Sequence, residues 1–166
     1  MTQQATFLVV EDNADDVILL RRAFTKAKIL NAVHFVRTGE DAVAYLNGFG
    51  RYSNRTEYPL PSLILLDLKM PGMSGHEFLG WVRGCPEFRS LRVVVLSSSD
   101  EMRDVNLAYQ LGASSYLIKP ADFDRFVEIS QALNGFWIWM DKAPPLAAGE
   151  EAETGDREAV RRATPV

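Results

Sequence analysis

The feature that most constrains the fold is a run of four apolar residues, Leu63 to Leu66, that leads directly into an aspartate, Asp67. Turn-forming residues follow, first Pro71-Gly72 and then Gly75. A continuous apolar run bounded by turn signals is typical of a strand buried on both faces, as in a parallel sheet. Asp67 would then either cap the following turn or present a reactive carboxylate at the mouth of the sheet, and this segment alone leaves both open.

Similar short apolar runs recur along the chain and alternate with stretches of helical spacing. The expected strands cover residues 7–10, 32–36, 63–67, 91–96 and 115–118. The expected helices begin near Asn13 or Asp15, Thr38, Ser74, Glu101 and Asp122, and two of them end at Cys85-Pro86 and Gly112. Five strands alternating with five helices predict an α/β fold with a parallel sheet, right-handed crossovers and helices on both faces.

Composition limits the possible classes of protein. A net charge of −4 argues against a nucleic-acid binder that relies on a basic surface. No segment approaches the ~18 consecutive apolar residues of a membrane span, and residues 1–4 lack the basic and apolar blocks of a signal peptide. Cys85 is the only cysteine, so no intrachain disulfide can form, and His34 and His76 are too few to favour a zinc site. We therefore expect a cytoplasmic protein.

Two segments fall outside the regular alternation. Residues 143–166 are rich in Ala, Pro, Gly, Glu and Arg, so we expect a domain over residues 1–142 followed by a flexible C-terminal tail or arm. The stretch Gly48–Ser62 is long for a loop in a compact domain and carries Arg51, Arg55 and Tyr52. It is either a solvated loop, which is the simpler interpretation, or a partner surface, and part of it could prolong the preceding helix.

Polar side chains follow four of the five expected strands: Glu11-Asp12, Asp67, Ser97 and Lys119. Ligands of open α/β sheets bind outside the carboxyl ends of the strands, so these residues should converge at one edge. Three carboxylates so close together raise one another's pKa unless a cation neutralises them. Oxygen-only ligands suit Mg²⁺, which the sequence therefore predicts as the bound ion.

The remaining two groups fit a phosphoryl group. The Lys119 ammonium can pair with one phosphate oxygen, and the Ser97 hydroxyl can hydrogen-bond to another. Asp67 would be the nucleophile that forms an acyl phosphate. Taken singly, Lys119 could be a solvated lysine and Ser97 a helix cap, but these interpretations do not account for all four strand ends together.

These motifs give the chain its resemblance to a known family. Glu11-Asp12, the segment Leu66 to Gly75 (LDLKMPGMSG), Ser97 and Lys119-Pro120 resemble the receiver domain of two-component response regulators, over about residues 5–140. The resemblance implies a flavodoxin-like (βα)5 fold with a parallel five-stranded sheet in the order 2-1-3-4-5. It also implies a regulator that catalyses only its own aspartyl phosphorylation and dephosphorylation.

The resemblance assigns a role to each matching residue. Asp67 resembles the phosphoacceptor, Asp12 the direct Mg²⁺ ligand, Glu11 a ligand through water, and the carbonyl of Lys69 a further ligand. Ser97 resembles the switch hydroxyl, and Tyr116 resembles the aromatic switch that turns inward on activation. The Lys119–Pro120 bond is usually cis in this family, whereas cis occurs in only ~5–6% of X–Pro bonds in general.

The family role implies a histidine kinase as the phosphoryl donor. The insertion Gly48–Ser62, the segment Ser114 to Ala121 and the aromatic end Phe136 to Met140 are similar to single-domain regulators of bacterial phytochrome kinases. We therefore expect a phytochrome-type kinase partner and an output through protein contact or phosphate relay, with no DNA-binding output domain after residue 143.

The end of the last helix suggests an interface. A single helix face can bury only some of its apolar residues, and contiguous exposed apolar surface usually marks a contact. We expect a homodimer formed by the last helix, the helix near Glu101–Leu111 and the arm at Pro144-Pro145. The alternative is that the tail shields the apolar side chains, which are Phe136, Trp137, Ile138, Trp139 and Met140.

Two rival functions use the same residues differently. A phosphatase similar to the haloacid dehalogenases would carry the motif Asp-x-Asp, but in this sequence Lys69 stands where the second aspartate of that motif would follow Asp67. A degenerate receiver would act only as a binding module, and the complete set of strand-end residues disfavours it.

Overall fold

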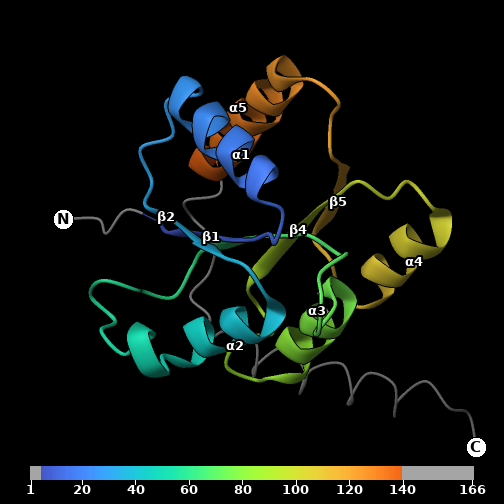
Figure 1. Cartoon of the computed structure of the whole chain (residues 1–166). Helices are drawn as coiled ribbons and strands as arrows, with labels where there is room; N and C mark the ends of the chain where they lie inside the picture. The colour runs from blue at the N-terminus through green and yellow to red at the C-terminus, as the bar shows by residue number, and fades with distance from the viewer. Residues whose placement is uncertain (1–4, 140–166) are drawn as a thin grey trace, which may run out of the picture. The chain divides into compact units, whose positions relative to one another are not determined.

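The computed structural model describes the backbone of residues 5–139 and the side chains of residues 5–135. Five parallel strands form one sheet in the order β2-β1-β3-β4-β5, as predicted (Figure 1). The strand order reverses direction at β1, because β2 lies on one side of it and β3 on the other. Ligands bind at such a point, here between β1 and β3, in open α/β sheets. The strands are β1 (Phe7–Val10), β2 (Val33–Val36), β3 (Leu63–Leu66), β4 (Arg92–Ser97) and β5 (Ser115–Ile118).

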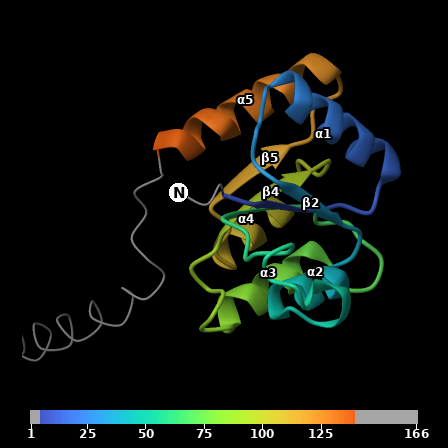
Figure 2. The same cartoon turned by 90° about the vertical axis from the view of Figure 1, so that its left-hand side faces the viewer.

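Helices cover both faces of this sheet. Helices α1 (Ala14–Lys26) and α5 (Phe123–Trp139) lie on one face, and α2 (Gly39–Asn47) and α3 (Gly75–Gly84) lie on the other (Figure 2). Helix α4 (Met102–Gln110) lies on the α3 side beside β5, at the edge of the sheet. All residues of β1 and β3 are buried, which explains why these strands have apolar side chains on both faces.

The helix ends follow the predicted signals. The side chains of Asn13, Thr38 and Ser74 each accept a hydrogen bond from a backbone N–H in the first turn of α1, α2 and α3. Cys85, the residue before Pro86, has an extended conformation and ends α3. Gly112 follows α4 with a φ of 95°, a value that favours glycine.

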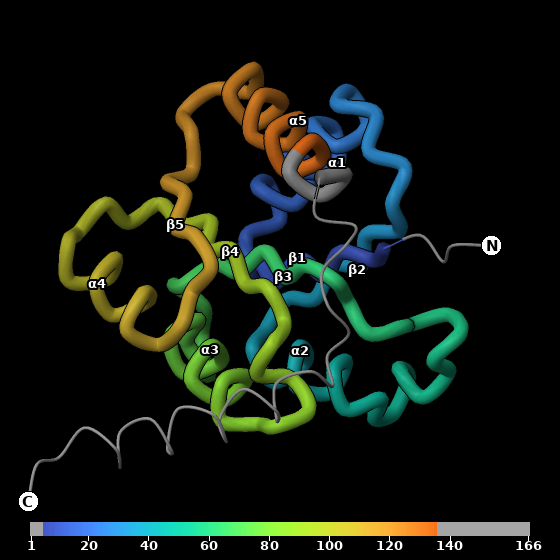
Figure 3. The backbone as a smooth tube through the Cα atoms, turned by 180° about the vertical axis from the view of Figure 1, so that it is seen from behind, coloured from blue at the N-terminus to red at the C-terminus, as the bar shows by residue number. Residues whose placement is uncertain are grey.

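The insertion between α2 and β3 is ordered by its own side chains. It contains a short 3-10 helix, η1 (Gly50–Tyr52), and then runs back to β3 (Figure 3). Tyr52 is buried against Tyr45 of α2, with ring centroids 5.0 Å apart. The Arg55 guanidinium donates hydrogen bonds to the carbonyls of Tyr45 and Leu46 at the end of α2. Tyr52 and Arg55 thus attach the insertion to the domain, so the interpretation as a merely solvated loop is wrong for them.

No helix among the described residues is long and apolar enough to cross a membrane.

Candidate functional site

The register of the sheet brings the predicted site residues together. The Asp67 N–H donates to the Val10 carbonyl at 3.0 Å, which places Asp67 beside Glu11 at the ends of β3 and β1. The Lys119 N–H donates to the Ser97 carbonyl at 2.8 Å, which places the lysine beside the end of β4. The main chain itself thus sets the spacing of Glu11, Asp67, Ser97 and Lys119.

Three carboxylates form a compact cluster at this edge. Glu11, Asp12 and Asp67 each offer one oxygen, and these oxygens lie within 4.8 Å of one another. Glu11 and Asp67 are 2% and 5% exposed, respectively, so water screens little of their mutual repulsion. Asp12 is half-buried and gives the cluster its open side.

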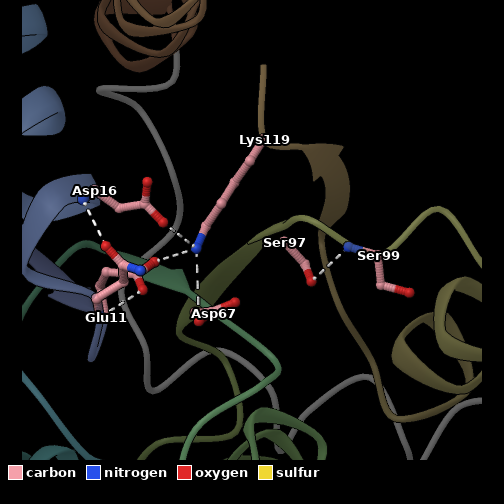
Figure 4. Close-up of polar contacts among 7 residues, drawn as sticks. Glu11, Asp16, Asp67, Ser97, Ser99 and Lys119 are labelled. Carbon is pink, nitrogen blue, oxygen red and sulfur yellow. Dashed lines mark hydrogen bonds and ion pairs between the residues drawn. The ribbon is translucent and has the colours of Figure 1, made fainter. Parts of the chain in front are cut away.

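Lys119 is the cation of the site. Its ammonium nitrogen lies 2.7 Å from Glu11 Oε2, 2.8 Å from Asp16 Oδ2 and 3.6 Å from Asp67 Oδ2 (Figure 4). The first two distances are those of charge-assisted hydrogen bonds, whereas the third is an ion pair without one. The lysine is therefore bound more closely by the β1–α1 side of the site than by Asp67.

The electrostatics of the site reflect its burial and its charges. The pKa of Glu11 is raised to about 7, chiefly by burial and in part by the charge of Asp67, and the hydrogen bond from Lys119 opposes the rise. Burial also raises the pKa of Asp67, against the opposing effect of Lys119. Burial alone would lower the pKa of Lys119, but hydrogen bonds to Asp16 and Glu11 outweigh it and the net shift is upward. One lysine thus does not neutralise the carboxylate cluster.

The donor set fits a hard divalent cation. All side-chain donors in the cluster are carboxylate oxygens, which Mg²⁺ and Mn²⁺ prefer. The cluster contains no sulfur or imidazole ligand of the kind that softer metals prefer. Burial raises the pKa values of Glu11 and Asp67, so their charged forms are unfavourable in the metal-free site, and a bound cation would stabilise those forms. The residues therefore fit the predicted magnesium site.

Ser97 and Tyr116 lie at the other end of the site. The Ser97 side chain is fully buried, and its hydroxyl oxygen accepts a hydrogen bond from the Ser99 N–H at 3.2 Å (Figure 4). Within the described residues, no hydrogen bond joins Ser97 to Asp67. The Tyr116 hydroxyl donates to the Ser99 carbonyl at 2.7 Å. Tyr116 is therefore already directed at the loop that follows β4.

One prediction for this site is wrong. All peptide bonds among the described residues are trans, including Lys119–Pro120, which was expected to be cis. The trans form is the one that X–Pro bonds prefer in general, by about 0.5–1 kcal/mol. Lys119 still reaches Glu11 and Asp67 from this backbone.

Three contacts in and around the site were not predicted from the sequence. Asp16 pairs with Lys119, Ser99 donates to the Asp104 carboxylate, and Glu40 accepts a hydrogen bond from the Met73 N–H in the loop after β3. Asp16 lies in the first turn of α1, and no sequence pattern indicates that it pairs with Lys119, 103 residues away. The contact between Ser99 and Asp104 is local, across the start of α4, whereas the contact between Glu40 and Met73 joins segments whose proximity only the tertiary structure establishes. The proposed dimer residues Phe136, Trp137, Trp139 and Met140 lie outside the described side chains.

Comparison with known proteins gives the family. Residues 7–131 match the model of the response regulator receiver domain, which is more than half of the chain. The chain belongs to this family, and it is accordingly a regulator rather than an enzyme that turns over a separate substrate.

Two curated relatives are similar over most of their length. A probable methanogenesis regulatory protein, FilR2 of Methanothrix harundinacea, is 33% identical over 140 residues, covering 82% of this chain and 86% of the relative. Response regulator Rcp1 of Synechocystis is 33% identical over 131 residues, covering 79% and 87%, respectively.

Solved structures agree with this assignment. A response regulator in red light signalling of R. palustris, RPA3017, has a TM-score of 0.77 at 35% identity, covering 84% of this chain and 96% of the other. The phosphorylated cyanobacterial phytochrome response regulator RcpA has a TM-score of 0.75 at 33% identity, covering 82% and 95%. The Mn²⁺-bound form of Rcp1 has a TM-score of 0.74 at 31% identity, covering 84% and 99%.

Proposed function

We propose that this protein accepts a phosphoryl group on Asp67 from a sensor histidine kinase and signals through contacts with other proteins. The observation that carries the proposal is the position of the Asp67 carboxylate. It is buried at the end of β3, next to two further carboxylates and 3.6 Å from the Lys119 ammonium. Membership in the receiver family supports the same role.

Glu11, Asp12 and Asp67 would hold a Mg²⁺ ion, with the carbonyl of Lys69 as a further ligand. The bound ion would supply positive charge to the phosphoryl oxygens and to the leaving group. The Mn²⁺-bound structure of the relative Rcp1 supports an ion of this class.

The chain's own residues perform the transfer. A carboxylate oxygen of Asp67 attacks phosphorus, the bond from phosphorus to the donor breaks, and the donor leaves with the bonding electron pair. Lys119 and the Ser97 hydroxyl hydrogen-bond to the phosphoryl oxygens and stabilise the acyl phosphate. Water later attacks phosphorus, which releases inorganic phosphate and restores the Asp67 carboxylate.

Switching follows from the position of Ser97. Its hydroxyl must turn from the Ser99 N–H toward Asp67 in order to contact a phosphoryl oxygen, which changes the loop after β4. Tyr116, bonded to the same loop, would follow this movement. This is a local charge event that biases a two-state element.

We propose a phytochrome-type kinase as the donor, because RcpA is a phytochrome response regulator and RPA3017 acts in red light signalling. The same proposal includes homodimerisation through the last helix and the C-terminal arm. It also includes a receiver domain over residues 1–142 with a tail over 143–166, and a cytoplasmic location. An output through DNA binding is not part of it.

Intact-mass spectrometry tests the proposal. After incubation with a small acyl phosphate and Mg²⁺, the wild-type protein should gain a single phosphoryl group, and Asp67→Asn should gain none. If the wild-type protein gains no phosphoryl group, the remaining interpretation is a degenerate receiver that acts only as a binding module. Rapid multiple turnover of an ordinary phosphoester would instead indicate a phosphatase.

A further inference from the structure

Asp16 makes a contact that neither the metal cluster nor the phosphoryl chemistry explains. Its carboxylate lies 2.8 Å from Lys119 Nζ, and this is the only side-chain partner of Asp16 among the described residues. The oxygens that could ligate a cation come from Glu11, Asp12 and Asp67, and Asp16 is not one of the group. Its side chain therefore acts on the lysine alone.

The same turn fixes both close partners of Lys119. The Asn13 N–H donates to Glu11 Oε1 at 3.0 Å, and the Asn13 side chain accepts from the Asp16 N–H at 3.1 Å. Asp16 thus sits in the first turn of α1 with its backbone held in place. The Asp16 side chain is 23% exposed, so its ion pair with the 10% exposed Lys119 is only partly screened by water.

The distances show where the lysine is held. Lys119 forms hydrogen bonds to Glu11 and Asp16, at 2.7 and 2.8 Å, but is 3.6 Å from Asp67. A phosphoryl group on Asp67 would present new anionic oxygens to the same ammonium. Asp16 and the phosphoryl group therefore attract one cation from two sides.

We propose that Asp16 is a positioning residue that competes with the phosphoryl group for Lys119 and thereby lowers the affinity of the site for that group. The inference rests on the proposed function of Asp67. Among the described residues no hydrogen bond joins the Asp16 side chain to Asp67 or to the other cation ligands, so the contact through which it would act is the one with Lys119.

Binding of beryllofluoride, an anion that mimics the phosphoryl group on aspartate, provides the test. In full-length protein at saturating Mg²⁺, Asp16→Asn should bind beryllofluoride about three- to tenfold more tightly than wild type, the effect of removing one competing ion pair. Asp15→Asn is the matched control, because exposed Asp15 lies in the same helical turn and has no ion pair among the described residues. It loses the same charge and should change the affinity less than twofold, on the order expected for distant exposed charges.

A double-mutant cycle separates competition from a general loss of charge. In the Lys119→Gln background, Asp16→Asn should have no more effect than Asp15→Asn. If wild type binds beryllofluoride and Asp16→Asn binds it no more tightly than Asp15→Asn does, the inference is wrong and the proposed function stands. A wild-type protein that does not bind beryllofluoride would instead contradict the proposed function.

A measurement on the metal-free protein tests the ion pair without any ligand. By nuclear magnetic resonance, the Lys119 ammonium protons should exchange with water faster in Asp16→Asn than in wild type or Asp15→Asn. Equal exchange in all three proteins would show that Asp16 does not hold the lysine, and would overturn the inference whatever the site binds.

Discussion

The Tyr116 hydroxyl donates a 2.7 Å hydrogen bond to the Ser99 carbonyl, which joins β5 to the loop after β4. Other hydrogen bonds hold the same loop, among them those from the Ser99 N–H to Ser97 Oγ and from the Ser99 hydroxyl to the Asp104 carboxylate in α4. Ser99 is therefore the point at which Ser97 beside the phosphoacceptor is linked to α4 and to Tyr116. A movement of Ser97 toward Asp67 would reach both elements through it.

Replacing Tyr116 with phenylalanine should weaken this junction. The change removes one hydrogen bond to a partly buried carbonyl and should lower the free energy of unfolding by about 1 kcal/mol. Urea denaturation of the metal-free protein measures it. Tyr109→Phe is the control, because Tyr109 accepts a hydrogen bond from the exposed Tyr116 N–H, which water can satisfy. An equal effect of the two substitutions would contradict the role of Tyr116 at Ser99.

Gly75 lets α3 approach the phosphoacceptor strand. A Cβ at this position would overlap the Asp67 carbonyl oxygen and lie 2.6 Å from Leu68 Cα. Gly75→Ala should therefore displace the main chain that carries Asp67, lower the free energy of unfolding by about 1–3 kcal/mol and slow phosphorylation.

The matched control lies in the same helix. A Cβ on Gly84 would meet nothing within 4 Å, so Gly84→Ala should leave the stability unchanged or raise it by up to about 1 kcal/mol. Thermal unfolding and the rate of acyl phosphate labelling should be measured on both variants. Normal stability and labelling of Gly75→Ala would show that the close approach is not required.

Stability should fall as the pH rises in the absence of metal. Burial raises the pKa of Glu11 from 4.5 to about 7, so between these values the folded protein holds a proton that the unfolded chain releases. The stabilising contribution is complete below pH 4.5 and is lost as the pH rises through about 7. The free energy of unfolding in chelator should therefore fall by up to about 3 kcal/mol between about pH 5 and 8.

Glu11→Gln is the control for this pH dependence, because it removes the titrating group and keeps the shape of the side chain. The slope should become shallower, although Asp67, whose pKa is also raised by burial, retains part of it. Urea unfolding across the pH range makes the comparison. A slope identical to that of wild type would show that Glu11 does not titrate in this range.

The sequence predicted those parts of the site that the main chain determines. The strand-end positions of Glu11, Asp67, Ser97 and Lys119 follow from apolar runs, and parallel pairing then brings them to one edge. The cis form of Lys119–Pro120 was an expectation from resemblance alone, and the bond is trans.

Contacts between side chains of distant segments were the part that could not be predicted. The partner of Asp16 lies 103 residues away in the chain, and no periodic pattern indicates such a pair. The insertion was similarly ambiguous, because arginine and tyrosine are equally suited to a partner surface and to an internal cluster. Only the tertiary packing around Tyr45 and the end of α2 shows that Tyr52 and Arg55 belong to an internal cluster.

Arg55 should be more important for stability than its neighbour Arg51. Arg55 is partly buried and donates to three carbonyls, those of Tyr45, Leu46 and Tyr52. Arg55→Ala should lower the free energy of unfolding by about 1–3 kcal/mol. Arg51→Ala removes a surface ion pair with Asp41, in which the arginine side chain is 68% exposed, and should cost less than about 1 kcal/mol. Equal effects in denaturant unfolding would contradict a structural role for the insertion.

The most direct test of the central claim is to locate the acyl phosphate on the chain. Borohydride reduces an aspartyl phosphate to homoserine, so the labelled protein can be reduced, digested and sequenced by mass spectrometry. We predict homoserine at position 67 after incubation with an acyl phosphate and Mg²⁺, and an unmodified Asp67 when the Mg²⁺ is chelated. Homoserine at another aspartate, or at none, would contradict the assignment of Asp67 as the phosphoacceptor.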